Sequence, residues 1–170
     1  MANLEHVKKI EQLRPILSDS DYFEVKTIVG KVSMREFIAS MLSYYPWWYV
    51  LLYRIRGVVA RVLRLAHENP PEELPCLQSS DVSLTPGENV TFFIVRSAKD
   101  NEYWIAETPE DKHLGAHFCI VIEPLEDDLK RFHVVTAVKY KHWTGPVYFN
   151  LIRLFHHIVV WRMMKIGVKK

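Results

Sequence analysis

The sequence predicts an α+β fold in which an antiparallel sheet packs against a long C-terminal helix. Three observations support this prediction. The helix expected at residues 147–166 is apolar almost all round, so it must pack against another apolar surface. Four strand-like segments precede this helix, and the short turns between them favour antiparallel hairpins. Alternate side chains of two of these strands are almost purely apolar and would cover the helix.

The composition indicates one globular domain. A chain of 170 residues can bury a sizeable core, and 49% hydrophobic with 25% charged residues is typical of folded proteins rather than disordered ones. A net charge of +2 without a run of lysines or arginines argues against nucleic-acid binding. Cys76 and Cys119 lack CxxC spacing, and no secretory signal is visible, so we expect a cytoplasmic protein.

The N-terminal part of the chain predicts an extension, a strand and a short helix. Residues 1–20 have a weak helical pattern, so we expect a partly helical extension, followed by a single domain over residues 21–170. The β-branched and aromatic content of residues 21–29 predicts the first strand. Ser33 and Glu36 form a capping-box pattern, which predicts that a short helix follows.

A second helix is expected over residues 46–66, with Pro46 in its first turn. It is amphipathic, with aliphatic side chains on one side and arginines on the other. This segment cannot span a membrane, because each central arginine costs roughly 2.5–3.5 kcal/mol and each Leu, Ile or Val returns only about 0.3–0.6 kcal/mol. The four arginines are Arg54, Arg56, Arg61 and Arg64. Residues 67–86 are then expected to form a long, proline-rich connection.

The remaining strands are expected at residues 89–97, 102–108, 117–124 and 131–140. The side chains expected to face the final helix are Phe118, Ile120, Ile122, Phe132, Val134, Thr136 and Val138. This assignment leaves His133 and Lys139 on the other face of the sheet. Thr144 is expected to cap the final helix, and Pro146 lies near its start.

Several short motifs follow one another in a characteristic order. They are Pro46–Trp47 with Arg54 and Arg56; Asp111, His113 and Leu114; Thr136 and Val138; Gly145 and Tyr148; and Phe155–His156. In their order and spacing, over about residues 21–166, the chain resembles the START-like (SRPBCC) superfamily, and most closely a bacterial family of unknown function within it. This resemblance implies a helix-grip fold: a curved antiparallel sheet wraps a long C-terminal helix, two shorter helices follow the first strand, and a ligand cavity lies inside.

Seven residues are candidates for lining such a pocket: Asp111, His113, Thr136, His142, Tyr148, Phe155 and His156. Asp111 and His113 could place a carboxylate against an imidazole, although a turn aspartate that binds its own backbone is commoner. His156 is either a hydrogen-bonded histidine at the edge of the core or a polar group of the pocket. The aromatic residues suit a cavity wall or ordinary packing equally well.

We expect neither a metal nor a cofactor. His156 and His157 are adjacent on a helix and point about 100° apart, so they cannot bind one metal ion together. His117 and His133 could be neighbours on the outer face of the sheet, but no third ligand is evident. We also expect His157 to lie on the polar side of the helix.

Three functional hypotheses remain. The first is binding of a small hydrophobic or lipid-like ligand in a cavity between the sheet and the C-terminal helix. The second is an enzyme of the cyclase or hydratase kind that acts on a hydrophobic substrate in the same cavity, with Asp111–His113 or His156 as the acid/base group. The third is a peripheral membrane or partner-docking protein that uses Trp47, Trp48 and Arg54. We favour a binding protein over an enzyme.

Overall fold

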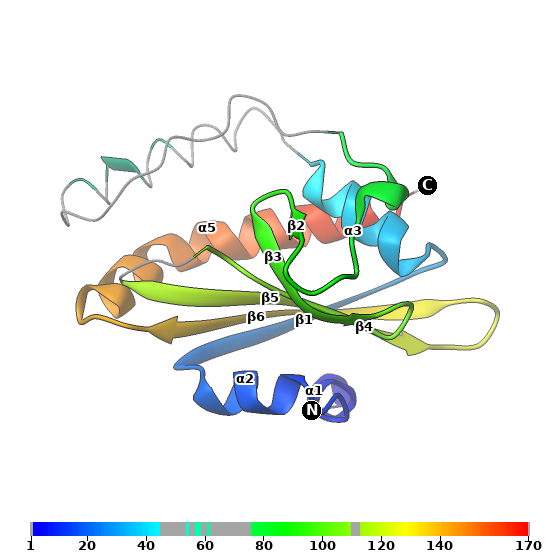
Figure 1. Ribbon diagram of the computed structural model, residues 1–170, viewed down its shortest axis with the longest axis horizontal. Coiled ribbons are helices and arrows are strands. Elements are labelled where there is room, and N and C mark those ends of the chain that lie inside the picture. The colour runs from blue at the N-terminus through cyan, green and yellow to red at the C-terminus, as the bar shows by residue number, and fades with distance from the viewer. Residues whose placement is uncertain are drawn as a thin grey trace.

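The computed structural model describes residues 2–44, 54, 57, 58, 61, 76–109 and 113–169. Its elements are α1 (Ala2–Lys8), α2 (Leu13–Asp19), β1 (Tyr22–Gly30), α3 (Met34–Leu42), the 3-10 helix η1 (Ser79–Asp81), β2 (Asn89–Val90), β3 (Phe93–Lys99), β4 (Tyr103–Glu107), β5 (Leu114–Pro124), β6 (Lys130–Tyr140) and α5 (Thr144–Gly167). The predicted α+β class is confirmed: a curved antiparallel sheet packs against a long C-terminal helix (Figure 1). Most of the helix expected over residues 46–66 and residues 67–75 of the predicted connection lie outside the described residues.

The six strands pair in the order β1-β6-β5-β4-β3-β2, and every neighbouring pair is antiparallel. The predicted hairpins between successive strands are therefore confirmed. One strand prediction is wrong, because residues 89–97 do not form a continuous strand. Val90 pairs with Phe93, and Thr91 has φ 57, so a tight left-handed turn reverses the chain between β2 and β3.

The side of the sheet that faces α5 is the one predicted. Phe118, Ile120, Phe132 and Val134 belong to the same buried cluster as Val160 and Met164 of α5. The alternation of apolar side chains along β5 and β6 predicted that these residues face α5, because successive side chains of a strand point to opposite faces.

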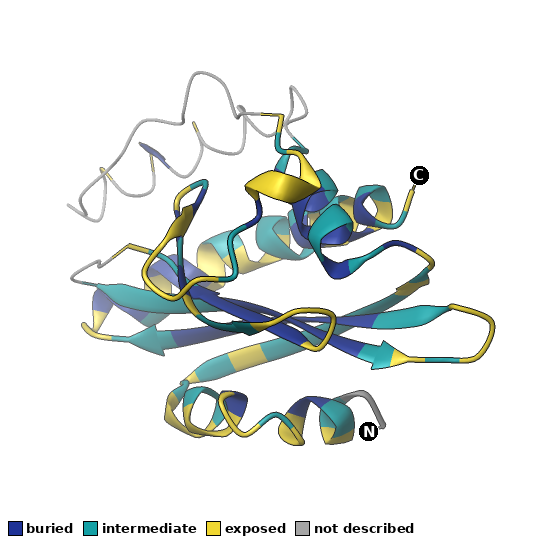
Figure 2. Cartoon of the chain, turned by 45° about the vertical axis from the view of Figure 1, so that its right-hand side comes forward, coloured by how far each residue is buried: buried dark blue, intermediate teal, exposed yellow. Residues whose placement is uncertain are grey.

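The other side of the sheet is also covered. Helices α1 and α2 lie across it, so the sheet is the middle of three layers (Figure 1). Val7 and Leu13 from these helices are fully buried with Cys119, Val121 and Val135 of the sheet. The predicted N-terminal extension is therefore two helices packed on the sheet. As a result, the central strands are buried on both faces (Figure 2).

Helix α3 packs against the end of α5. The predicted capping box is confirmed: the N–H of Ser33 donates to Glu36 Oε2 (2.7 Å), and the N–H of Glu36 donates to Ser33 Oγ (3.2 Å). Gly167 allows the close approach of the two helices, since a Cβ there would lie 2.8 Å from the ring of Phe37. Among the described residues, no helix is both long and apolar enough to cross a membrane.

Candidate functional site

The predicted site residues fall into two groups along the side of the sheet that faces α5. His113, His142 and Thr144 form a hydrogen-bonded junction cluster where β6 passes into α5. Thr136 and His156 lie further along, near Glu24, Lys26 and His157; we call Glu24, Lys26, His156 and His157 the inner polar cluster.

In the junction cluster, Thr144 bridges two imidazole rings. Its Oγ1 lies 3.0 Å from Nδ1 of His113 and 3.0 Å from Nδ1 of His142, and the two rings are nearly perpendicular. The backbone N–H of Thr144 also donates to Nδ1 of His142 (3.4 Å), so this nitrogen acts as an acceptor. All three hydrogen bonds form together when Nδ1–H of His113 donates to Thr144 Oγ1 and the hydroxyl of Thr144 donates to Nδ1 of His142.

This arrangement corrects the capping prediction. The residue before the helix is Trp143, which makes no side-chain capping bond, and Thr144 is the first helical residue. The hydroxyl of Thr144 is turned to the two histidines instead. The first turn of α5 lies so close to the start of β5 that a Cβ at Gly145 would be 2.7 Å from the carbonyl oxygen of His113. The absence of a side chain at Gly145 allows this approach.

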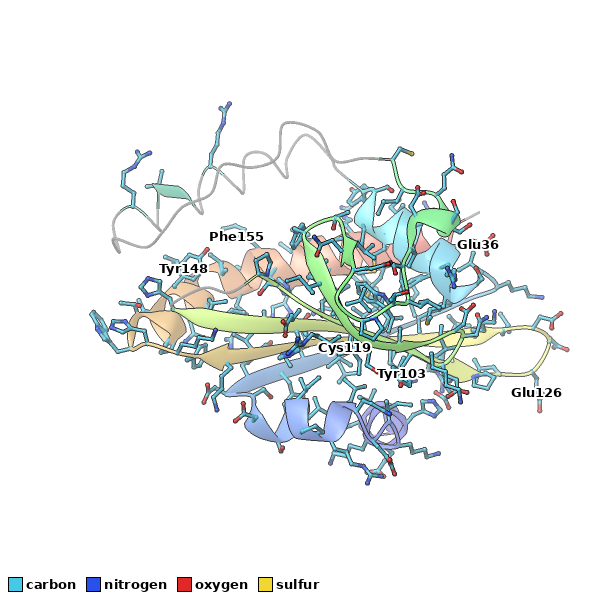
Figure 3. The ribbon with its side chains drawn as sticks, in the orientation of Figure 1. Glu36, Tyr103, Cys119, Glu126, Tyr148 and Phe155 are labelled. Carbon is cyan, nitrogen blue, oxygen red and sulfur yellow. The ribbon has the colours of Figure 1, made fainter. Side chains whose placement is uncertain are left out.

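The other predicted pocket residues occupy different environments. Tyr148 is buried near the start of α5, and Phe155 is half-buried further along the helix (Figure 3). Thr136 is buried on the predicted inner strip of β6. Asp111 lies outside the described residues, so the proposed Asp111–His113 pair has no structural description.

The inner polar cluster lies between β1 and α5. Glu24 stands directly opposite Thr136 of β6, and Lys26 stands opposite Val134, so both charged side chains point towards α5. They form an ion pair with each other, at 22% and 16% side-chain exposure. Both also reach His157, whose Nδ1 is 2.8 Å from Glu24 Oε1 and 2.7 Å from Lys26 Nζ.

These two contacts of His157 exclude each other chemically. A protonated Nδ1 donates to the carboxylate of Glu24, whereas an unprotonated Nδ1 accepts from the ammonium of Lys26. Nδ1 of His157 can therefore bond to either Glu24 or Lys26 at one time, but not to both. The prediction that His157 lies on the polar side, away from the sheet, missed this contact with β1.

The surroundings of His156 favour its neutral form. Burial disfavours the imidazolium, and the positive charge of Lys26 adds to this effect, so the pKa of His156 falls to about 4. Glu24 opposes the shift only in part. His156 is therefore neutral at pH 7 and offers one hydrogen-bond donor and one acceptor.

Sequence reasoning missed Glu24 and Lys26. The available signal was the alternation in residues 21–29, which places Tyr22, Glu24, Lys26 and Ile28 on one face of the strand. The sequence alone did not reveal that β1 pairs with β6, and this pairing turns that face towards α5.

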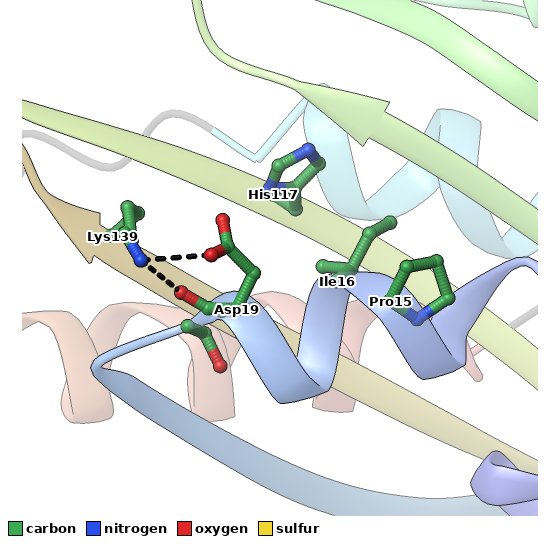
Figure 4. Close-up of a pocket in the computed structure, with 7 residues that line it drawn as sticks. Pro15, Ile16, Asp19, His117 and Lys139 are labelled. Carbon is green, nitrogen blue, oxygen red and sulfur yellow. Dashed lines mark hydrogen bonds and ion pairs between the residues drawn. The ribbon is translucent and has the colours of Figure 1, made fainter.

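One cavity lies on the opposite face of the sheet from the predicted one. It has a volume of about 350 Å³ and lies between α2 and the sheet (Figure 4). Its lining residues are Pro15, Ile16, Asp19, Ser20, His117, Ala137 and Lys139. Lys139 Nζ donates to the backbone oxygen and the carboxylate of Asp19, both at 2.8 Å. Burial lowers the pKa of His117, although Glu107 opposes this shift.

A second histidine of the outer face is buried under α1. His133 is fully buried, and its Nε2 lies 3.0 Å from Glu123 Oε2. Its ring stacks on His6 at 5.3 Å, and among the described residues its Nδ1 has no hydrogen-bond partner. His117 and His133 are not neighbours, since His117 pairs with Ala137 and His133 with Val121. Within the described ranges, no three His, Cys, Asp or Glu side chains gather as metal ligands.

The chain matches a family model. The family model described as "Protein of unknown function (DUF2867)" matches residues 16–163, which include every strand and all but the last residues of α5. No curated protein matches the chain. The match covers most of the chain, and on this basis the protein belongs to the DUF2867 family.

Proposed function

We propose that this protein binds a small, mainly hydrophobic molecule between the sheet and α5, and that the inner polar cluster holds the polar end of that molecule. One observation carries the proposal: a Glu–Lys pair and two histidines meet between layers that are otherwise apolar. Polar groups in such a place lose hydration, which destabilises the fold unless they are fully paired. Binding sites commonly contain a few such groups within an apolar lining.

The charge of the cluster indicates the chemistry of the polar end. Glu24 and Lys26 neutralise each other, and the lowered pKa of His156 keeps its imidazole uncharged. A neutral imidazole and the hydroxyl of Thr136 suit an uncharged oxygen, either a hydroxyl that donates and accepts or a carbonyl that accepts. We therefore expect an apolar molecule with a hydroxyl or carbonyl group.

The fold supports the proposal by analogy. A six-stranded antiparallel sheet packed against a long C-terminal helix is the arrangement expected of START-like proteins, and we propose that the family belongs to that superfamily. The family match itself assigns no activity.

The test is native mass spectrometry of the protein purified from its host. We expect an additional mass of a small molecule that organic solvent releases. Thr136→Val and His156→Leu keep the side-chain volumes close to the originals and remove the hydrogen-bonding groups, so occupancy should fall at least about tenfold. Thr108→Val, at the residue after β4, serves as the matched control and should retain the bound molecule. A wild-type protein that carries no such mass and whose layers are completely filled by side chains would refute the proposal.

An enzyme of the cyclase or hydratase kind remains the alternative, and the junction cluster is the observation that favours it. His113, Thr144 and His142 form a hydrogen-bonded row in which a proton can pass between two imidazoles. His156 is a poorer general base, because an imidazole with a pKa of about 4 binds protons weakly at neutral pH. Loss of turnover in Thr144→Val with unchanged ligand occupancy would favour the enzyme.

A further inference from the structure

Helix α5 has an apolar face that points away from the sheet. Its members are Val147, Leu151, Leu154, Ile158 and Trp161, with exposures of 49%, 53%, 66%, 49% and 41%. They follow one another at steps of four and three residues, which keeps them on one side of a helix. We call this set the outer stripe. Phe149, Val160 and Met164 are buried on the other side of α5, and exposed and buried residues alternate along the helix in Figure 2.

A continuous apolar stripe of this kind is unusual on a protein surface. Single exposed hydrophobic residues need no explanation, but a contiguous set marks an interaction surface. The stripe is about 21 Å long, because its ends are fourteen residues apart at 1.5 Å per residue. The five side chains of the stripe can therefore contact one extended apolar surface at the same time.

The acidic and basic side chains of α5 are all positive. Helix α5 contains Arg153, Arg162 and Lys165, and no acidic residue occurs between Thr144 and Gly167. Arg162 and Lys165 are exposed on the stripe side of the helix. A second copy docked helix to helix through this face would offer these cations no acidic residue of its own α5 to pair with. The partner should instead be negatively charged.

Tryptophans lie at both ends of the outer stripe. Trp143 is 72% exposed immediately before the helix, and Trp161 closes the stripe, with Lys165 Nζ 5.1 Å from the centre of its ring. Tryptophan is enriched where lipid head groups meet the acyl chains, and lysine and arginine bind the phosphates above. Apolar residues, flanking cations and terminal tryptophans together match a helix that lies in the plane of a membrane surface.

We propose that the outer stripe of α5 docks on the surface of a bilayer that contains anionic phospholipids. The aliphatic side chains enter the boundary between head groups and acyl chains, and Arg162 and Lys165 contact the phosphates. The proposal uses other residues than the earlier membrane hypothesis, which concerned Trp47, Trp48 and Arg54. It is also independent of the proposed ligand site, because the outer stripe and the inner polar cluster lie on different sides of α5.

The test is flotation of the full chain with vesicles of phosphatidylcholine alone and with about one third phosphatidylglycerol. We expect binding to the anionic vesicles, and weaker binding when NaCl rises from about 0.1 M to about 0.5 M. Leu151→Ser/Leu154→Ser and Arg162→Glu/Lys165→Glu should each lower the partition coefficient at least about tenfold.

The matched controls alter similar side chains elsewhere. Phe23→Ser/Val29→Ser removes two exposed apolar residues of β1, and Lys8→Glu/Lys9→Glu reverses two exposed charges near the N-terminus. Both controls should bind the vesicles as the wild type does.

Three results would overturn the proposal. The first is absence of binding to anionic vesicles, and the second is binding that Leu151→Ser/Leu154→Ser leaves unchanged. The third is a protein partner on the stripe. If that partner is a second copy, Leu151→Ser/Leu154→Ser would turn a dimer into a monomer in light scattering. If it is another segment of the same chain, the same variant would lower the thermal midpoint of unfolding.

Discussion

Gly145 in the first turn of α5 lies against the backbone carbonyl of His113, the residue before β5, and a Cβ on the glycine would stand 2.7 Å from that oxygen. The same oxygen accepts the N–H of Lys141 at 2.9 Å, so it is held in place. This contact fixes where α5 leaves the sheet, and it brings Thr144 within 3.0 Å of His113. The junction cluster therefore depends on a residue that has no side chain.

Gly145→Ala should destabilise the protein by about 1–3 kcal/mol, because the added methyl group meets backbone that cannot move without breaking a hydrogen bond. Urea unfolding followed by circular dichroism measures this change. Gly115→Ala is the control, since a Cβ there would meet only the flexible end of Lys141, at 3.4 Å. Its effect should stay within about 0.5 kcal/mol, and equal effects of the two variants would contradict the proposed role of Gly145.

Stability should fall as the pH drops below 6.5, and His156 should account for a large part of the loss. Its pKa is about 4 in the folded protein and 6.5 for a free side chain, so the unfolded chain takes up the proton first. The corresponding loss between pH 6.5 and pH 4 is up to about 3 kcal/mol. His156→Leu should flatten the pH dependence over this window in urea titrations. Leu154→Ala, at an exposed position of the same helix, changes no titratable group and should leave the slope unchanged.

The tautomer of His157 should follow its partner. In Lys26→Met the carboxylate of Glu24 remains, so Nδ1 of His157 should carry the proton and donate to it. In Glu24→Gln the ammonium of Lys26 remains, so Nδ1 should be unprotonated and accept from it. The ¹⁵N chemical shifts of the imidazole distinguish these two states. If His157 keeps one tautomer in both variants, the two contacts do not compete as described.

The helices on the outer face should contribute strongly to stability. Leu13→Ala removes a fully buried side chain between α2 and the sheet and should cost about 2–5 kcal/mol. Leu154→Ala makes the same chemical change at a position that is 66% exposed, and its effect should lie within about 0.5 kcal/mol. Denaturant unfolding of the two variants gives the comparison. A small loss for Leu13→Ala would mean that α2 is only loosely attached.

The strands of the core were predictable because their signal is local. Alternation along β5 and β6 identified the inner residues, from Phe118 to Val138, before any pairing was known. The hairpin at Thr91 was missed because neither Thr91 nor Phe92 is a usual turn residue, and their aromatic and β-branched neighbours continue the strand pattern.

The site was less predictable because it depends on contacts between distant segments. His113 and His142 were named as candidates, yet their link through Thr144 depends on where α5 begins, and the capping pattern suggested another use for that hydroxyl. Glu24 was missed because its importance depends on its pairing with Thr136, more than a hundred residues away. The weak apolar pattern of residues 1–20 also gave no sign that Val7 and Leu13 are fully buried.

Seven consecutive residues of β6, from Phe132 to Val138, are buried. Four of them point towards α5, and the three between them point towards α1 and α2 or their side of the sheet. Side chains of this strand therefore contact both helical layers, and a shift of the strand towards one layer alters its packing against the other. A substitution that changes the volume of a β6 side chain on one face should therefore also affect the helical layer on the other face.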